Sequence, residues 1–189
     1  AAERNIISDN YYGAVAIHTD AADNNQVIGN YIGVAADGST EMANGQGVVV
    51  WEQADDNMIG GVNPGEGNLI VGGTKGVHVA NTADDAAVLG NSIYGQSVAG
   101  IDLNSDGVTL NDPNDADSGP NDLLNYPVLT SAAQNGGNLD ITFELDVPAG
   151  TYLIEFFDNP NGIHTSGYGG GEVFLGAVTV TSSGTGTQV

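Results

Sequence analysis

Cysteine, basic residues and long apolar runs are scarce or absent in this sequence. Cysteine is absent, which leaves the compartment open, because hydrogen-bonded strands that stack into a continuous core need no disulfides. Only Arg4 and Lys75 are basic, against 24 Asp and Glu. This balance excludes nucleic acid and anionic membrane surfaces as partners, since both require clustered Lys and Arg. No stretch approaches the roughly 18 apolar residues of a membrane span, which excludes membrane insertion.

The formal net charge of −22 points to partners of the opposite kind. It favours cations, a salty medium, or neutral and basic partners. Halophilic adaptation and calcium loading both remain open as its explanation. Hydrophobic residues make up 40% of the 189 residues, so the chain is not a disordered acidic tail.

Short apolar segments recur along the chain at a fixed spacing. The segment Asn5-Ile6-Ile7 returns 63 residues later as Asn68-Leu69-Ile70, and Gly13-Ala14-Val15 returns at the same offset as Gly76-Val77-His78. Further copies of these two half-units are Gln26-Val27-Ile28-Gly29-Asn30, Gly47-Val48-Val49-Val50, Asn57-Met58-Ile59, Ala87-Val88-Leu89 and Gly100-Ile101-Asp102-Leu103. Such self-similarity is typical of repeat architectures.

Each repeat predicts a short strand with alternating apolar positions, preceded by Gly or Asn. One such strand cannot bury its inner face alone, but coils stacked about 4.8 Å apart bury it together. Asn at recurring turns can form hydrogen-bonded ladders along the stack, and Asn and Gly both tolerate the left-handed conformation of sharp corners. No Gly-free segment has a sustained helical period. A solenoid fits this pattern better than the alternative, an antiparallel sandwich.

The repeats resemble the right-handed parallel β-helix repeats of large bacterial cell-surface and secreted proteins. The residues that carry the resemblance are Asn25–Gly33, Val34–Thr40, Asn57–Gly61 and the stretch from Gly100 through Asn111–Asn121 to Leu129, and Glu155–Phe157 with Gly167–Gly176 resemble the β-rich module that often follows such solenoids. The resemblance implies an all-β protein located outside the cell or on its surface. Residues 1–128 are expected to form the parallel β-helix, and residues 129–189 a small antiparallel β-sandwich-like module that is possibly incomplete. Strands in that module are expected near 139–145, 151–158 and 172–181.

An acidic loop is the main candidate site. Its oxygen-bearing residues are Asp106, Asp112, Asn114, Asp115, Asp117, Asn121 and Asp122. Calcium takes six to eight oxygen ligands in flexible geometry, and crowded carboxylates repel one another unless a cation lies between them. The spacing is not that of an EF-hand. The sequence therefore predicts structural calcium, with a solvated acidic loop as the alternative.

Catalysis is a competing hypothesis, because many parallel β-helix proteins cleave polysaccharides. A polyuronate lyase usually needs a basic residue for its substrate's carboxylate and as its base, and only two basic residues exist. A hydrolase needs two or three carboxylates in one cleft, and Asp102, next to the acidic loop, or Asp85 on a neighbouring coil can supply them in principle. The histidines fall on distant segments, and His78 is expected to point outward from its strand. We assign no catalytic residue on this basis.

Single aromatic residues raise the alternative of carbohydrate binding. Tyr11, Tyr12, Tyr31, Trp51 and Tyr94 can stack on sugars, although single aromatics more often cover a solenoid corner. The favoured function is a non-enzymatic, calcium-stabilised structural or adhesive segment. Its open β edges invite pairing with another chain, which allows head-to-tail fibres. The alternative is a carbohydrate-binding or polysaccharide-hydrolysing module.

Overall fold

A computed structural model describes residues 3–184 of the chain. These residues contain fifteen strands and one short 3-10 helix, η1 (Pro120–Leu123). The chain divides into two compact units whose segments alternate along the sequence. Unit 1 comprises Ala1–Thr109, Gly119–Asn121 and Glu155–Gly176, and unit 2 comprises Leu110–Ser118, Asp122–Ile154 and Ala177–Val189. The boundary expected at residue 128 stays a prediction.

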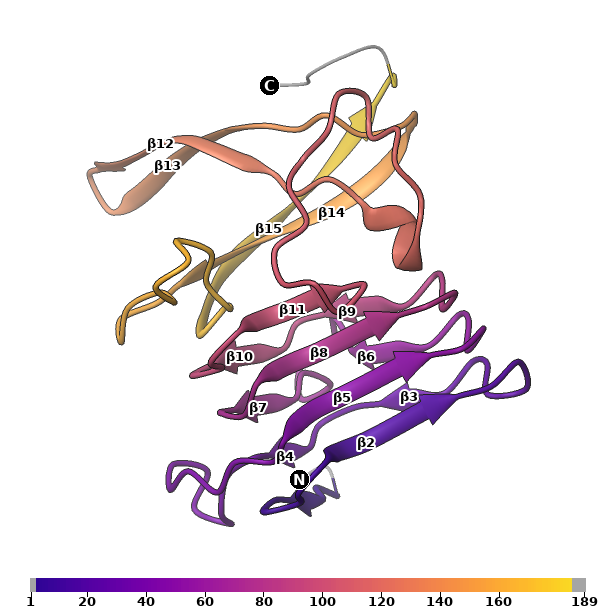
Figure 1. Ribbon diagram of the computed structural model, residues 1–189. Helices are drawn as coiled ribbons and strands as arrows, with labels where there is room; N and C mark the ends of the chain where they lie inside the picture. The colour runs from indigo at the N-terminus through magenta and orange to yellow at the C-terminus, as the bar shows by residue number, and fades with distance from the viewer. Residues whose placement is uncertain (1–2, 185–189) are drawn as a thin grey trace. The chain divides into compact units, whose positions relative to one another are not determined.

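Three parallel sheets form most of unit 1 (Figure 1). The first sheet holds β1 (Ile6–Ile7), β4 (Tyr31–Ile32), β7 (Leu69–Val71) and β10 (Ser92–Tyr94). The second holds β2 (Gly13–His18), β5 (Gln46–Trp51), β8 (Lys75–Ala80) and β11 (Ala99–Leu103). The third holds β3 (Gln26–Val27), β6 (Met58–Gly60) and β9 (Ala87–Leu89). Each strand thus pairs with the strand three places later, so the chain visits the three sheets repeatedly in one order.

The core of unit 1 lies between these sheets. In the second sheet Val48 and Val50 of β5 pair in register with Val77 and Val79 of β8, and all four side chains are fully buried. Together with Ile32, Ile59 and Ile70 from the other two sheets, these valines form one buried hydrophobic cluster. Its members are Ile17, Val27, Ile32, Val48, Val50, Ala54, Ile59, Ile70, Val77, Val79, Ala83, Ala86 and Ile93. Burying one such aliphatic side chain stabilises the fold by about 1.5–3 kcal/mol. The alternation seen in the sequence therefore marks the inward positions.

Asparagine ladders run along three corners of unit 1, as the sequence predicted. In each ladder the backbone N–H and the side-chain amide of one Asn both donate to Oδ1 of the next Asn. The longest ladder joins Asn5, Asn30, Asn68 and Asn91, and two shorter ones join Asn10 to Asn44 and Asn25 to Asn57. Buried polar groups are stable only when hydrogen-bonded, so these ladders hold one strand in register with the next.

Unit 2 contains the two-stranded sheet of β12 (Val128–Asn135) and β13 (Asn138–Glu144) and part of a second two-stranded sheet, that of β14 (Gly150–Asp158) and β15 (Val173–Ser182). β12 and β13 form an antiparallel hairpin. β14 pairs with β15, and both strands contribute residues to each unit. The three strands expected in this region are present within about one residue of their predicted bounds, whereas β12 was not predicted because its apolar residues are broken by Thr130, Ser131 and Gln134.

The structure confirms an all-β protein with parallel sheets followed by antiparallel pairing. Helix is limited to η1 among residues 3–184. In that part of the chain there is also no helix long and apolar enough to cross a membrane.

Candidate metal centre

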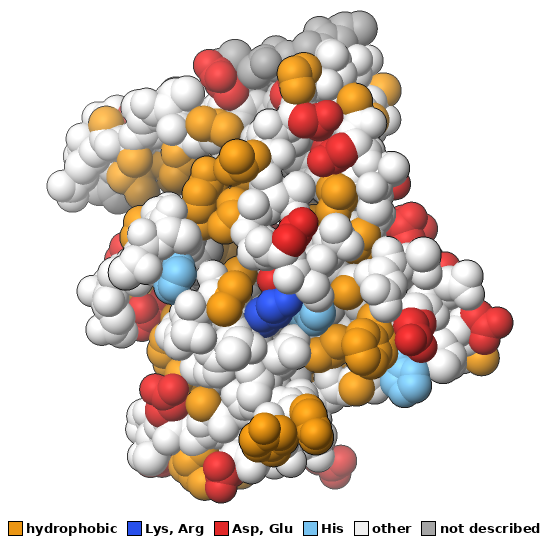
Figure 2. Space-filling model, viewed as in Figure 1, with side chains coloured by type: hydrophobic (Ala, Val, Ile, Leu, Met, Phe, Trp, Pro, Cys, Tyr) orange, Lys and Arg blue, Asp and Glu red, His pale blue; other side chains and the backbone are white. Residues whose placement is uncertain are grey.

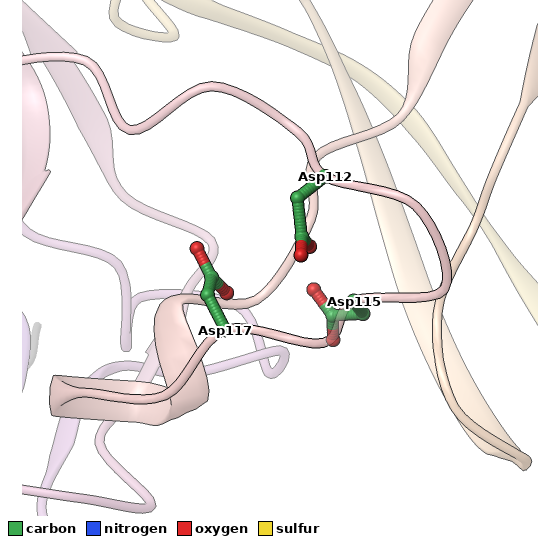
Figure 3. Close-up of side chains that lie close together, drawn as sticks. All are labelled: Asp112, Asp115 and Asp117. Carbon is green, nitrogen blue, oxygen red and sulfur yellow. The ribbon is translucent and has the colours of Figure 1, made fainter.

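Three aspartates of the acidic loop lie close together in unit 2. Asp112, Asp115 and Asp117 each offer a carboxylate oxygen, and these oxygens lie within 4.8 Å of one another. Figure 3 shows the three side chains turned toward a common space. Asp112 and Asp115 are partly buried, and Asp117 is exposed. Three carboxylate oxygens at this spacing can serve as ligands of one hard cation.

Asn125 fixes the backbone of this loop. It is 5% exposed, its Oδ1 accepts from the backbone N–H of Asp112 at 3.0 Å, and its Nδ2 donates to the carbonyls of Asp112 at 2.9 Å and Asp146 at 2.7 Å. The N–H of Asn125 in turn donates to Oδ1 of Asp115 at 2.7 Å. The buried side-chain amide of Asn125 thereby fixes the loop that carries the aspartates. Asn125 is a positioning residue that the acidic pattern did not predict, because it lies outside the acidic run. Its position as a single Asn among apolar residues could have indicated it.

The loop also contains strained and unsatisfied polar groups. Asn114 and Asp115 both adopt left-handed backbone conformations, with φ of 63° and 53°. The N–H of Asn114 donates to Oδ2 of Asp146 at 3.0 Å, while Oδ1 of Asp146 is buried and has no hydrogen-bond partner among the described residues. Burying a carboxylate oxygen without a hydrogen-bond partner costs free energy, and a cation or water bound beside Oδ1 of Asp146 would offset that cost.

Crowding of negative charge is visible in the electrostatics of Asp115. Burial raises the pKa of its carboxyl above the ordinary value of 3.8, and the hydrogen bond from the Asn125 N–H opposes this shift. The charges of Asp117, Asp112 and Asp122 raise the pKa further. A cation bound among these carboxylates would relieve that repulsion.

Both basic side chains of the sequence are engaged elsewhere and do not neutralise the carboxylates of the acidic loop. Arg4 lies 4.0 Å above the Tyr31 ring and donates to the Gly29 carbonyl, and Lys75 Nζ lies 2.8 Å from Oδ2 of Asp102, all within unit 1. These two are the sole Lys and Arg of the sequence. Figure 2 shows acidic side chains spread across the visible face and the blue of basic residues in a single place. Neutralisation of the loop therefore falls to cations from solution.

The other predicted ligands fall into different positions. Asp122 is near enough to influence Asp115 electrostatically, and Asn114 contributes the backbone contact to Asp146. Asp106 is exposed and belongs to unit 1. Asn121 also belongs to unit 1, where its side chain bonds the N–H of Ala86 at 2.9 Å and the carbonyl of Ala86 at 2.8 Å. The geometry thus gathers three of the seven residues, and the rest stay predictions as ligands.

A second polar cluster lies on the second sheet of unit 1. Asp102 of β11 pairs in register with His78 of β8, and both side chains are buried, at 0% and 5% exposure. His78 therefore points away from the valine core, as predicted, but it is covered. Its Nδ1 lies 3.0 Å from Oε1 of Gln46, and its Nε2 is hydrogen-bonded to Oγ of Ser105. Asp85 is exposed, whereas Asp102 is buried with its Oδ2 2.8 Å from Nζ of Lys75.

We expect this cluster to make the stability of unit 1 depend on pH. Burial lowers the pKa of His78, the charge of Lys75 lowers it further, and the charge of Asp102 opposes both. Because the unfolded chain has the ordinary histidine pKa of 6.5, it binds the proton first as pH falls. The contribution of the neutral His78 to the free energy of unfolding is therefore fully present above pH 6.5. It declines as the pH drops below 6.5 toward the lower pKa that His78 has in the folded chain.

Urea unfolding at pH 8 and pH 5.5 measures this decline. His78→Gln should make the difference in unfolding free energy between the two pH values smaller, since the titrating group is gone. The matched variant is His18→Gln, at an exposed position of β2, which should keep the wild-type difference. Equal pH dependence in all three proteins would contradict the assignment.

The aromatic residues do not gather on one surface. One face of the Tyr31 ring is covered by Arg4, and Trp51 of β5 lies edge-on to His18 with ring centroids 6.1 Å apart. Tyr11 and Tyr12 are highly exposed and pack edge-on against each other at 4.8 Å. Tyr94 lines a separate cavity of about 240 Å³ together with Gln96, Asn159, Asn161, His164 and Glu172. Carbohydrate binding by these residues stays a prediction.

No protein-family model matches the chain, and no solved structure matches it significantly.

Proposed function

We propose that this chain is a calcium-stabilised structural segment of an extracellular or cell-surface protein, and that its three-sheet unit is a right-handed parallel β-helix. The single observation that carries the proposal is the meeting of three carboxylate oxygens of Asp112, Asp115 and Asp117 within 4.8 Å, on a loop held by a buried amide. The cation supplies what the chain lacks, a positive charge among these oxygens. Its role is to order the loop of unit 2.

Calcium suits this site better than transition metals do. The ligands are carboxylates, with backbone carbonyls nearby and no thiolate in the sequence, and hard oxygen ligands favour calcium or magnesium. The set is irregular and partly exposed, which suits calcium's flexible coordination more than the strict octahedron of magnesium. Extracellular calcium modules bind with Kd on the order of 0.1–1 mM. We expect the affinity of this site to fall in that range, so that calcium-rich surroundings fill it.

Calcium titration by calorimetry tests the site directly. We expect one ion to bind to the wild-type chain, and Asp115→Asn to weaken the affinity by about tenfold or more, because it removes a charged ligand from the centre of the triad. At a calcium concentration about 100 times the Kd, binding would stabilise the folded chain by about 2.7 kcal/mol. The same increment should vanish on chelation.

Asp158→Asn is the matched control. It removes one negative charge from an exposed position of β14, so the change in net charge equals that of Asp115→Asn. Its calcium affinity should equal that of the wild type. Equal weakening in both variants would indicate diffuse attraction of cations by the acidic surface and would overturn the site.

Self-association is the further element of the proposed role. Among residues 3–184, β1, β2 and β3 each stand at the end of their sheet, and an outer edge of this kind can pair with a further strand, from another chain in the proposed assembly. Light scattering in millimolar calcium, and again after chelation, measures the assembly. A mass above that of one chain that falls on chelation would support calcium-dependent assembly, whereas a monomer in both conditions would remove assembly from the proposal and leave the calcium site to calorimetry.

A further inference from the structure

Ser105, His78 and Gln46 form a hydrogen-bonded chain that the structural role does not use. Oγ of Ser105 bonds Nε2 of His78, and Nδ1 of His78 lies 3.0 Å from Oε1 of Gln46. An amide oxygen can only accept, so the ring hydrogen is on Nδ1 and the free lone pair is on Nε2. Nε2 therefore accepts the hydroxyl hydrogen of Ser105. A hydroxyl, a base that takes its proton, and a third group that orients the base are the parts of an activated nucleophile.

The three side chains come from different parts of unit 1 and meet beside the second sheet. Gln46 begins β5, His78 lies within β8, and Ser105 follows the end of β11 at Leu103. Ser105 is exposed, whereas His78 is only 5% exposed. The nucleophile thus faces solvent while its base is protected. A merely structural hydrogen bond would not require this division.

The turn that carries Ser105 has a left-handed backbone. Asn104 and Ser105 have φ of 73° and 68°, and Glu52 and Gln53 adopt the same conformation at the turn that follows β5. The backbone N–H groups of Ser105 and Asp106 donate to no acceptor within residues 3–184. Backbone N–H groups without an intramolecular acceptor are available to donate to an oxygen of a bound substrate.

The ion pair of Asp102 and Lys75 lies beside His78. Asp102 is fully buried, its Oδ2 lies 2.8 Å from Nζ of Lys75, and its Oδ1 has no hydrogen bond to the described residues. Register places Asp102 directly opposite His78 on the adjacent strand. The negative charge of Asp102 favours the imidazolium that forms when His78 accepts a proton, while burial and the charge of Lys75 oppose it.

We propose that Ser105 is the nucleophile of an acyl-transfer site that hydrolyses small, solvent-accessible carboxylic esters. His78 acts as general base, and Gln46 is a positioning residue that holds the imidazole tautomer. This inference stands independently of calcium binding.

The reaction proceeds in two balanced steps. In the first, Oγ of Ser105 bonds to the ester carbonyl carbon, its proton passes to Nε2 of His78, and the carbonyl π electrons move to oxygen. The carbonyl then reforms, the bond to the alcohol oxygen breaks, and that oxygen takes the proton from Nε2, which leaves an acyl-serine. In the second, water attacks the acyl carbon with its proton passing to Nε2, and Oγ of Ser105 leaves and recovers that proton.

A fluorophosphonate probe tests the nucleophile on the full chain. We expect covalent labelling located by mass spectrometry on the peptide that contains Ser105, and none on exposed Ser118, which has no such histidine. Ser105→Ala should abolish labelling, and His78→Gln should slow it by about 100-fold or more. Wild-type protein that is unlabelled, or labelled equally at Ser118, would overturn the proposal whether or not any variant folds.

Gln46 variants separate positioning from packing. Gln46→Leu should slow labelling at least about tenfold, because the imidazole loses its orienting acceptor, whereas Gln46→Glu keeps an acceptor and should restore the rate. Gln46→Glu should also move the midpoint of the labelling rate against pH upward, since its charge favours the imidazolium. Unchanged rates and midpoints in both folded variants, verified by circular dichroism, would overturn the role of Gln46. Hydrolysis of p-nitrophenyl acetate, lost in Ser105→Ala, would supply the second readout.

Discussion

Gly60→Ala should destabilise unit 1 by about 3–5 kcal/mol. Gly60 ends β6 with a left-handed φ of 84°, which costs a residue with a Cβ about 1–2 kcal/mol. The added carbon would also collide with the carbonyl oxygen of Leu89 and with the side-chain amide of Asn91. Neither can retreat, because Leu89 belongs to β9, which pairs with β6, and Asn91 is the last member of the longest ladder.

Gly65→Ala is the matched control for this prediction. Gly65 has nearly the same φ, 89°, but a Cβ there meets nothing within 4 Å. The conformational strain is therefore shared, and the difference between the variants isolates the collision. Urea unfolding should give a loss of about 1–2 kcal/mol for Gly65→Ala. Equal losses would mean that the third sheet yields easily and is not closely stacked.

Asn68→Ala is the second large loss we expect, also about 3–5 kcal/mol. The Asn68 side chain is 2% exposed and makes four hydrogen bonds. Its Oδ1 accepts from the N–H and the side chain of Asn30 at 3.0 and 3.1 Å, and its Nδ2 donates to Oδ1 of Asn91 at 2.9 Å and to the Val27 carbonyl at 2.6 Å. Alanine removes all four bonds. Oδ1 of Asn91 keeps the bond from the backbone N–H of residue 68, and Nδ2 of Asn30 keeps its bond to the Ile28 carbonyl, but the buried N–H of Asn30 and the Val27 carbonyl lose the bonds that Asn68 gives them. Each buried group left unsatisfied costs about 1–3 kcal/mol, though the costs do not simply add.

Asn5→Ala tests whether burial is what makes the ladder matter. Asn5 is the exposed end of the same ladder, and its side chain contributes one bond, from Nδ2 to Oδ1 of Asn30 at 2.9 Å. The backbone N–H of Asn5 keeps its own bond to that oxygen. We therefore expect a loss of no more than about 1 kcal/mol. A loss at Asn5 equal to that at Asn68 would show that the ladder contributes through local turn geometry instead.

Strand positions in unit 1 followed from the sequence because two independent signals coincide there. Alternation places Val48, Val50, Val77 and Val79 inward, and the recurring Asn marks each corner. Where the signals separate, prediction failed. β12 carries Thr, Ser and Gln among its apolar residues and is exposed along its length, so no buried face imposes a pattern on it.

The sequence indicated the kind of residue at the candidate sites, but it did not indicate which of these residues come together. Crowded carboxylates identify the acidic loop, but the choice of Asp112, Asp115 and Asp117 depends on loop closure by Asn125, which is set by hydrogen bonds to distant backbone. His78 was placed on the outer side of its strand by alternation alone. Its partners Gln46 and Ser105 are separated from it by 32 and 27 residues, and no local pattern connects them.

The longest ladder joins residues separated by unequal lengths of chain. Asn5 to Asn30 spans 25 residues, Asn30 to Asn68 spans 38, and Asn68 to Asn91 spans 23, yet the same bonds form at each step. The longer interval contains an excursion with its own bridge between Val34 and Glu41. Strand pairing is thus indifferent to how much chain lies outside it. Insertions at these corners are consequently a route by which such a scaffold acquires new surface loops while its stacking is preserved.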